Sequence, residues 1–206
     1  MIFIKNTYEM NKNSSYVVRI KNRNKKKFFL GLLSRSYLYL RFGFNRKIAR
    51  YKGAKIGSSS IIPLKLALKA NENLVVGDDV IIETNDLDLR SKIIIQDHCI
   101  IGKNVSIIRV SHYLDSKFTT KYYKPLIIEP YTWLATGAKV LPSCELISKG
   151  SVIGAWSVVV KNTLPNSVYS GFPAVKLKDR SFLFDDLVVV SLKGGDLLTY
   201  FKAYYD

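Results

Sequence analysis

Aliphatic residues recur at every sixth position over much of this chain, and this period constrains the fold more than any other feature of the sequence. A period of six matches neither the 3.6-residue turn of an α-helix nor the two-residue alternation of a strand. The repeat occurs in two blocks and includes Val76, Ile82, Ile95, Ile101, Ile107, Ile128, Leu134, Val140, Leu146, Ile153 and Val159, with one-residue slips before Leu89 and before Ile153.

Small residues follow the aliphatic ones at a fixed distance of four. These positions are Cys99, Val105, Ser111, Thr132, Ala138, Cys144, Ser151 (counted from Ile147) and Ser157. The pattern predicts a coil whose turn is a triangle of three short strands, with the aliphatic residue pointing inward and the small residue near a corner. Glycines directly after aliphatic residues, Gly57, Gly77, Gly102 and Gly154, accommodate the backbone at that point. We therefore expect an all-β parallel β-helix over residues 54–180, whose coils supply each other's core.

The repeat is interrupted between Ser111 and Leu126. This stretch, SHYLDSKFTTKYYKPL, is polar, aromatic and irregular. It predicts a loop near residues 112–126 that protrudes from the prism. Long loops within compact repeats are usually functional.

Basic residues are concentrated near the N-terminus. Of the net charge of +16, residues 1–55 carry +14, from 15 Lys/Arg and the single acid Glu9. We therefore separate a basic N-terminal arm (1–53) from the β-helix (54–180) and from a C-terminal extension (181–206), for which a packed strand or helix is expected.

Residues 28–44 predict a short amphipathic helix in this arm, with Phe28, Phe29, Leu32, Leu33, Leu40 and Phe42 as its apolar residues. It either caps the main body or, together with the lysines of residues 21–27, makes peripheral contact with an anionic membrane or polymer through residues 21–50. Nucleic-acid binding is not expected, because no known reading motif accompanies the charge.

The two cysteines, Cys99 and Cys144, lie inside the apolar repeats and indicate small core residues in a reducing compartment. No apolar run approaches the length of a membrane span, and no secretory signal is evident, so a cytoplasmic location is expected. With only two histidines and no metal-type spacing, no metal site is predicted. His98 is expected to be a surface residue.

Three further motifs lie in order along residues 95–180. Ser111-His112 closes one coil, Ile128-Glu129-Pro130-Tyr131-Thr132-Trp133-Leu134 follows, and Ile153-Gly154-Ala155-Trp156-Ser157-Val158-Val159 precedes Lys161 and Gly171-Phe172-Pro173-Ala174. The segment resembles the hexapeptide-repeat acyltransferases, especially the galactoside, maltose and exopolysaccharide (colanic acid type) O-acetyltransferases. The resemblance implies a left-handed β-helix. Three departures stand out: Tyr113 and Leu114 precede Asp115, Ala135 replaces a glycine, and Trp156 replaces another glycine where the backbone meets the cofactor.

The resemblance implies transfer of acetyl from acetyl-CoA to a hydroxyl group. An imidazole, with its ordinary pKa near 6.5, is suited to take the hydroxyl proton at neutral pH. His112 is therefore the predicted base. Asn85 is a candidate to stabilise the oxyanion; a turn asparagine is the alternative reading.

The remaining site residues are also implied by the resemblance. The acetyl-CoA site would include Trp133, Ala135, Gly154, Ala155, Lys161, Pro173, Lys176, Lys178 and Arg180, with the cations near its phosphates. The loop residues Tyr113, Asp115, Phe118, Tyr122 and Tyr123 would contact a saccharide acceptor or pack within the assembly. That assembly would be a homotrimer in which His112 of one chain faces the cofactor-binding coils of the next.

Three functional hypotheses follow. The first is an O-acetyltransferase acting on a bacterial surface polysaccharide (capsule, O-antigen or exopolysaccharide) or its precursor. The second is an N-acetyltransferase of a nucleotide-linked amino sugar, and the third is a catalytically inactive β-helix scaffold. The scaffold would not bind acetyl-CoA.

Overall fold

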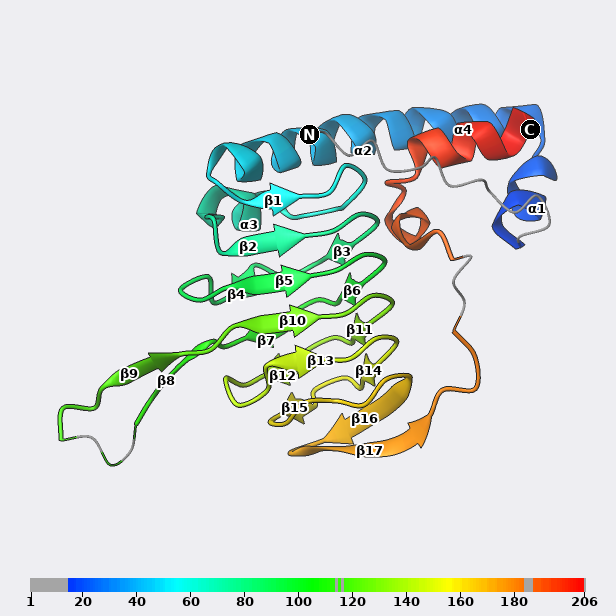
Figure 1. The fold of residues 1–206 in the computed structure, drawn as a ribbon. Coiled ribbons are helices and arrows are strands. Elements are labelled where there is room, and N and C mark those ends of the chain that lie inside the picture. Colours follow the sequence, from blue (N-terminus) through cyan, green and yellow to red (C-terminus); the bar gives the residue numbers. More distant parts are fainter. Residues whose placement is uncertain (1–14, 114, 116, 184–186, 206) are drawn as a thin grey trace, which may run out of the picture.

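Three sheets of mainly parallel strands form the faces of a triangular prism in the computed structural model (Figure 1). The structure describes residues 15–113, 115, 117–183 and 187–205. Sheet A contains β1 (Lys55–Ile56), β2 (Leu74–Val76), β5 (Ile93–Ile95), β10 (Leu126–Ile128) and β13 (Leu146–Ile147). Sheet B contains β3 (Ile81–Ile82), β6 (Ile100–Ile101), β11 (Trp133–Leu134), β14 (Val152–Ile153), β16 (Ser167–Gly171) and β17 (Ala174–Asp179). Sheet C contains β4 (Asp86–Leu87), β7 (Ser106–Ile107), β12 (Lys139–Val140) and β15 (Val158–Val159). The predicted parallel β-helix is confirmed.

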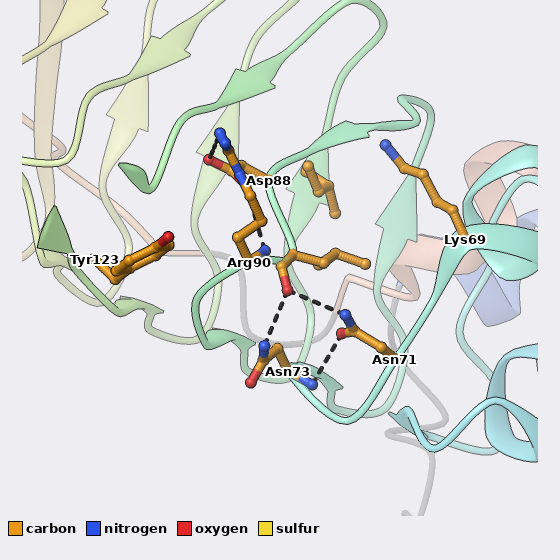
Figure 2. Close-up of a pocket in the computed structure, with 8 residues that line it drawn as sticks. Lys69, Asn71, Asn73, Asp88, Arg90 and Tyr123 are labelled. Atoms are coloured by element: carbon orange, nitrogen blue, oxygen red, sulfur yellow. Dashed lines mark hydrogen bonds and ion pairs between the residues drawn. The ribbon is translucent and has the colours of Figure 1, made fainter. Parts of the chain in front are cut away.

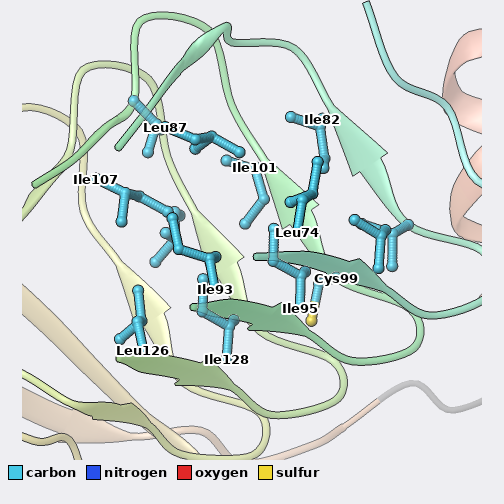
Figure 3. Close-up of a cluster of buried hydrophobic side chains, with 14 of the residues drawn as sticks. Leu74, Ile82, Leu87, Ile93, Ile95, Cys99, Ile101, Ile107, Leu126 and Ile128 are labelled. Carbon is cyan, nitrogen blue, oxygen red and sulfur yellow. The ribbon is translucent and has the colours of Figure 1, made fainter. Parts of the chain in front are cut away.

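The core of the prism is built from aliphatic residues stacked in register. On sheet B, Ile82 pairs with Ile101, which pairs with Leu134 in the next coil. These side chains are at most 1 % exposed. Figure 3 shows the same arrangement for the neighbouring columns, where side chains from all three sheets fill the interior. The aliphatic positions of the six-residue repeat therefore point inward, with one exception.

The exception is Leu146, which the six-residue count had placed in the core. Ile147 is fully buried and pairs with Ile128, whereas Leu146 is only partly buried. The extra residue of this coil lies in the turn before β13. The slip therefore lies between Val140 and Ile147, one strand earlier than the sequence count placed it.

Glycine is required at Gly57 by close approach between coils. A Cβ atom at Gly57 would lie 2.1 Å from the carbonyl oxygen of Gly77 in the next coil. The amide of Gly57 donates to the Val76 carbonyl, so the two coils cannot move apart without losing this bond. The glycine predicted from the repeat therefore serves packing between coils.

Helices close the first end of the prism. The helix α2 (Lys25–Tyr51) lies across the first coil, in which α3 (Leu64–Lys69) takes the place of a sheet C strand (Figure 1). Asn45 donates to the carbonyl of Ile62 at 2.8 Å, and Arg46 donates to that of Ser60 at 3.0 Å. These bonds satisfy carbonyls that have no further coil above them.

The helix α2 differs from the predicted helix in length and in apolar pattern. It has 27 residues, and its predicted apolar residues divide between two faces. Phe28 is buried and Leu32 packs beside it, whereas Phe29, Leu33 and Leu40 are exposed. The predicted helix is therefore present and caps the prism, but it is longer than predicted and its apolar residues lie on two faces. None of the described helices, α2 included, has both the length and the hydropathy needed to cross a bilayer.

The C-terminal extension returns along sheet B to the capped end. Its 3-10 helix η1 (Val189–Lys193) packs on Ile61 and Ile81, and α4 (Leu197–Tyr205) lies beside α2 and α1 (Ser15–Lys21). Asp196 is buried and accepts hydrogen bonds from Arg35, at 2.8 Å, and from the Tyr16 hydroxyl. The expectation of a packed terminal helix is thus met within the described residues.

The interruption of the repeat forms a β-hairpin. The strands β8 (Val110–His112) and β9 (Lys121–Tyr123) pair antiparallel and project away from the prism (Figure 1). The predicted protruding loop is therefore ordered at its base. The amide of Lys124 donates to the Arg109 carbonyl at 3.0 Å, which closes the hairpin where it leaves the prism.

Arg109 anchors this base from inside the prism. Its side chain is 0 % exposed and donates to carbonyl oxygens from three turns of the chain: those of Ile108, Pro125, Val140, Leu141 and Cys144. Burial lowers the pKa of the guanidinium. A planar group with five N–H donors suits an array of carbonyls at a chain branch. Arg109 therefore ties the hairpin to the coils that carry it.

We predict that Arg109→Met lowers the free energy of unfolding by at least about 3 kcal/mol, since each hydrogen bond from a charged donor contributes about 1.5–3 kcal/mol and the buried carbonyls lose their partner. Urea denaturation at one fixed protein concentration measures this change. The matched control is Arg90→Met, because the Arg90 side chain is 60 % exposed and a solvent-screened ion pair such as its contact with Asp88 contributes little to stability. Equal losses in the two variants would contradict the anchoring role of Arg109.

Candidate active site

Two adjoining cavities form a groove on the outer face of sheet B. They have volumes of about 690 and 350 Å³, and Trp133 and Arg180 line both. The larger cavity lies between sheet B and the returning C-terminal extension, and its apolar lining includes Ile100, Trp133, Ala135, Leu187, Val189 and Leu192. We call the two cavities together the sheet B groove.

The groove contains five of the nine residues predicted to bind the cofactor. Trp133, Ala135, Ala155 and Arg180 line the larger cavity, and Lys178 lines the smaller one. The Arg180 guanidinium donates to the Gly150 carbonyl at 2.7 Å, which fixes its position at the junction of the two cavities. The groove thus has an apolar section and a cationic end.

The other four predicted residues do not line either cavity. The Lys176 ammonium forms an ion pair with the Asp179 carboxylate at 2.6 Å, and both residues belong to β17. Gly154 lies against the Ser170 side chain, 2.9 Å from where its Cβ would be. Lys161 and Pro173 are exposed on the last coils.

Trp156 departs from the family pattern but leaves the larger cavity open. The residue adopts a left-handed backbone with φ of 60°, a conformation in which glycine is much less strained. Its indole ring lies over Gly137, where an added Cβ would be 2.5 Å from the ring. Trp156 therefore covers the neighbouring corner of the prism, while the adjacent Ala155 still faces the cavity.

His98 is not the surface residue expected from its position in the coil. Its side chain is only 10 % exposed, and its ring stacks on Tyr131 with a centroid distance of 4.9 Å. Both residues adopt left-handed backbone conformations at the same corner of two adjacent coils, so their rings lie one above the other. This places His98 in the wall of the larger cavity.

A second, polar pocket lies at the base of the hairpin (Figure 2). It has a volume of about 590 Å³ and is lined by Lys69, Asn71, Asn73, Leu87, Asp88, Leu89, Arg90 and Tyr123. Asn71 and Asn73 both donate to the Leu89 carbonyl, at 3.1 and 2.9 Å. We call this cavity the polar pocket.

The charged pair of the polar pocket is fixed by short contacts. Arg90 donates twice to Asp88, at 2.7 and 2.9 Å, and these bonds hold the pKa of the Asp88 carboxyl at about 2. The Asp88 carboxylate also accepts from the Arg109 amide at 3.1 Å. The pocket is therefore connected directly to the anchored base of the hairpin.

His112 and Tyr123 share one face of the hairpin. The register pairs Val110 with Tyr123 and His112 with Lys121. Paired residues, and residues two apart on one strand, point to the same side of an antiparallel ladder. Because Tyr123 lines the polar pocket, His112 projects on the side of the hairpin that faces this pocket.

The other predicted acceptor residues lie elsewhere on the hairpin. Tyr113 and Tyr122 occupy the opposite face, with ring centroids 4.9 Å apart. Asp115 and Phe118 lie near the exposed tip, and Phe118 is 82 % exposed. The structure therefore separates Tyr123 from the rest of the predicted acceptor set.

Asn85 does not lie beside His112 within one chain. Asn85 directly precedes β4, whose Asp86 pairs with Ser106, whereas His112 lies six residues beyond Ser106. The two residues are therefore at opposite ends of this edge of sheet C. Asn85 therefore stays a candidate donor to the oxyanion, and the structure of one chain does not test that role.

His112 and the sheet B groove lie on opposite sides of the prism. Figure 1 shows the β8–β9 hairpin projecting from one side, and β6, β11 and β14 of sheet B on the other. Trp133, which lines the groove, belongs to β11. One chain therefore contains both parts of the predicted site but does not bring them together.

Several residues of these sites carried only weak signals in the sequence. In the sequence, Arg109 is a single charged residue among aliphatic ones. The polar residues that line the polar pocket include Asn71 and Asn73, two positions apart, and Asp88 and Arg90, also two positions apart. The side chains of the C-terminal extension that close the groove had no local signal. Their position depends on the packing of α4 on α2.

The lining of the groove is of the kind that acetyl-CoA requires. Its pantetheine arm requires an extended, largely apolar channel, and its phosphates require cations, which Arg180 and Lys178 provide at one end. Among the described residues, no three His, Cys, Asp or Glu side chains are grouped so that they could hold a metal ion.

Comparisons with known proteins agree with this geometry. The chain is 34 % identical over 141 residues to the putative colanic acid biosynthesis acetyltransferase WcaF of Escherichia coli, covering 65 % of this chain and 73 % of that protein. It is also 34 % identical over 119 residues to the galactoside O-acetyltransferase of Lactococcus lactis, covering 55 % of this chain and 52 % of that protein. No protein-family model matches the chain.

Solved structures show the same fold. A hexapeptide-repeat acetyltransferase from Vibrio cholerae, complexed with acetyl-CoA, superposes with a TM-score of 0.58 at 20 % identity, over 81 % of this chain and 84 % of that one. A maltose O-acetyltransferase from Clostridium difficile superposes with a TM-score of 0.52 at 22 % identity, over 82 % and 91 %. With the repeat, the prism and the E. coli relative, these findings show that the chain belongs to the hexapeptide-repeat acetyltransferases.

Proposed function

We propose that this acetyltransferase moves acetyl from acetyl-CoA to a hydroxyl of a saccharide, in a site shared by two copies of the chain. The observation that carries the proposal is the separation of His112 from the sheet B groove. A base on one side of the prism can act on a donor bound on the other side only if a second copy brings the two together. The family resemblance points to a homotrimer as that assembly.

The sheet B groove is the proposed donor site. Trp133 and Ile100 would bound the acetyl and pantetheine part, while Arg180 and Lys178 would face the phosphates. Support comes from the acetyl-CoA complex of the Vibrio cholerae protein, which has the same fold. The open cavity beside Trp156 argues against the inactive-scaffold hypothesis.

His112 is the proposed general base. Its imidazole would take the proton of the acceptor hydroxyl as that oxygen attacks the thioester carbonyl, and the same proton would then pass to the departing thiolate. The anchored hairpin holds His112 at a fixed position relative to the polar pocket. Backbone amides near Ala135 of the second copy, or Asn85 of a neighbouring chain, remain the proposed donors to the oxyanion.

The polar pocket is the proposed acceptor site. Amides, a carboxylate and cations line it, and these groups bind sugar hydroxyls, while Tyr123 offers a ring face for a pyranose. The relatives that are named for colanic acid biosynthesis and for galactosides favour a saccharide of a bacterial surface polysaccharide or its precursor. N-acetylation of a nucleotide-linked amino sugar stays the second candidate, with no feature that favours it.

A reducing, cytoplasmic setting is proposed for this reaction. Cys99 and Cys144 are buried free thiols, and burial raises the pKa of Cys99 to about 12 and that of Cys144 to about 11. Thiols held in this protonated form inside the core need no disulfide for stability.

We predict that His112→Ala lowers kcat with a saccharide acceptor by about 10²–10⁴-fold, the usual contribution of a positioned base. Acetyl-CoA binding, measured by calorimetry, should stay within about twofold of the wild type, because the groove of each chain is untouched. Retention of more than about a tenth of the wild-type rate would remove His112 from the mechanism. Failure of a folded wild type to bind acetyl-CoA would instead support the scaffold.

For the acceptor site, we predict that Tyr123→Ala raises the KM for the saccharide by about tenfold while the KM for acetyl-CoA is unchanged, because only the polar pocket loses a wall. Tyr113→Ala is the matched control, since Tyr113 is 57 % exposed, Tyr123 is 52 % exposed, and they occupy opposite faces of the hairpin. An equal effect of both substitutions would contradict the assignment of the acceptor to the face that carries His112.

A further inference from the structure

The helix α2 has an apolar face that none of the described residues covers. An α-helix turns by about 100° per residue, so Leu30, Leu33, Tyr37, Leu40 and Phe44, spaced by three and four, lie along one line. Their exposed fractions lie between 61 and 71 %. Phe29 and Tyr51, 55 % and 93 % exposed, extend this line at its two ends. We call these seven side chains the outer face of α2.

The outer face points away from the rest of the molecule. The buried residues of α2 are Phe28, Asn45, Arg46 and Ala49, which contact α4 or the first coil. By the same rotation, they lie on the opposite side of the helix from the outer face. Since α2 lies across the end of the prism, the outer face looks outward along the prism axis (Figure 1).

The segment that carries the outer face contains cationic residues and no acidic ones. Residues 15–71 contain fifteen Lys or Arg and no Asp or Glu. The exposed Lys26 and Lys47 continue the spacing of the apolar line, four residues before Leu30 and three after Phe44. A row of aromatic and aliphatic side chains within a cationic surface is the composition of a helix that lies at an anionic membrane surface.

The start of α2 carries a feature that is unfavourable for the helix itself. Lys25, Lys26 and Lys27 occupy its first turn, where the N-terminal end of the helix dipole disfavours positive charge, and no acidic residue offsets them. Asn24 caps the helix by accepting from the Lys27 amide at 2.8 Å. An anionic partner outside the chain would offset this unfavourable placement of three positive charges.

We propose that the outer face of α2 docks the enzyme on an anionic lipid bilayer. A second copy of the same face is a poorer partner, because pairing would bring two cationic surfaces together. A soluble anionic polymer would use the lysines but would leave the apolar row exposed to water. An anionic bilayer can bind both the lysines and the apolar row, since it accepts apolar side chains below its anionic headgroups.

The docking surface also suits the proposed trimer. If three prisms stand parallel, their α2 helices lie at the same end and their outer faces lie in one plane. Three weak contacts would then act together on one bilayer. This last point depends on the proposed assembly, whereas the docking itself is independent of acetyl transfer.

Sedimentation of the full chain with phosphatidylcholine vesicles, with and without phosphatidylglycerol, tests this proposal. We expect partition onto the anionic vesicles that is at least about tenfold stronger than onto the neutral ones. The combined variant Leu30→Ser, Leu33→Ser and Leu40→Ser should weaken partition by at least about tenfold. Replacing Lys25, Lys26 and Lys27 by Gln should weaken it by roughly a hundredfold, at about fivefold per lysine.

The matched control replaces three exposed aliphatic residues at the other end of the prism, Leu164→Ser, Val175→Ser and Leu177→Ser, whose exposed fractions are 56, 58 and 63 %. It should keep partition within about twofold of the wild type. The proposal is overturned if the wild type does not partition, if the control loses as much as the α2 variant, or if the α2 variant instead splits a larger oligomer. The proposal is also overturned if the protein does not bind vesicles but binds heparin, and if the serine variant binds heparin as well as the wild type does. That result would identify a site for a soluble anionic polymer. Circular dichroism and acetyl-CoA binding confirm that each variant is folded.

Discussion

Each coil of the prism buries its aliphatic side chains only against the coils above and below it, and the remaining structure follows from this constraint. The two ends of such a stack would expose apolar side chains and unpaired strand edges. At the first end, α2 and α3 cover the core, and side chains of α2 satisfy the carbonyls of the first coil. At the other end, β17 pairs antiparallel with β16 and ends the run of parallel strands.

The straight walls of a solenoid also determine where a site can form. A stack of similar coils has no deep cleft of its own, so cavities arise where something departs from the repeat. Two such departures are seen among the residues that the structure describes. The hairpin β8–β9 creates the polar pocket at its base, and the returning C-terminal extension creates the sheet B groove. Because these departures lie on opposite sides of the prism, the site that we propose would need a second copy of the chain.

The repeat in the sequence was sufficient to predict the prism, because inward positions are determined locally by period and residue type. It misplaced Leu146, since a count of six cannot tell on which side of a turn an extra residue lies. Trp133, Ala135, Ala155 and Arg180 were predicted from motifs and do line the groove. The roles of Arg109 and His98 were not predicted, because they depend on contacts with segments distant in the chain. For α2, apolar residues and a membrane contact were predicted, but which of those residues stay exposed depends on the packing of α4 and the first coil.

The central claim is that His112 of one chain serves the sheet B groove of another, and mixing of inactive variants tests it most directly. His112→Ala removes the base, and Ala135→Trp fills the groove of the chain that carries it. Equal amounts of the two variants are unfolded together and refolded as mixed assemblies. About a quarter of the sites should then combine an intact base with an intact groove, and the activity should be about a quarter of that of the wild type. Activity no greater than that of the separate parents, in assemblies shown to be mixed, would contradict a shared site.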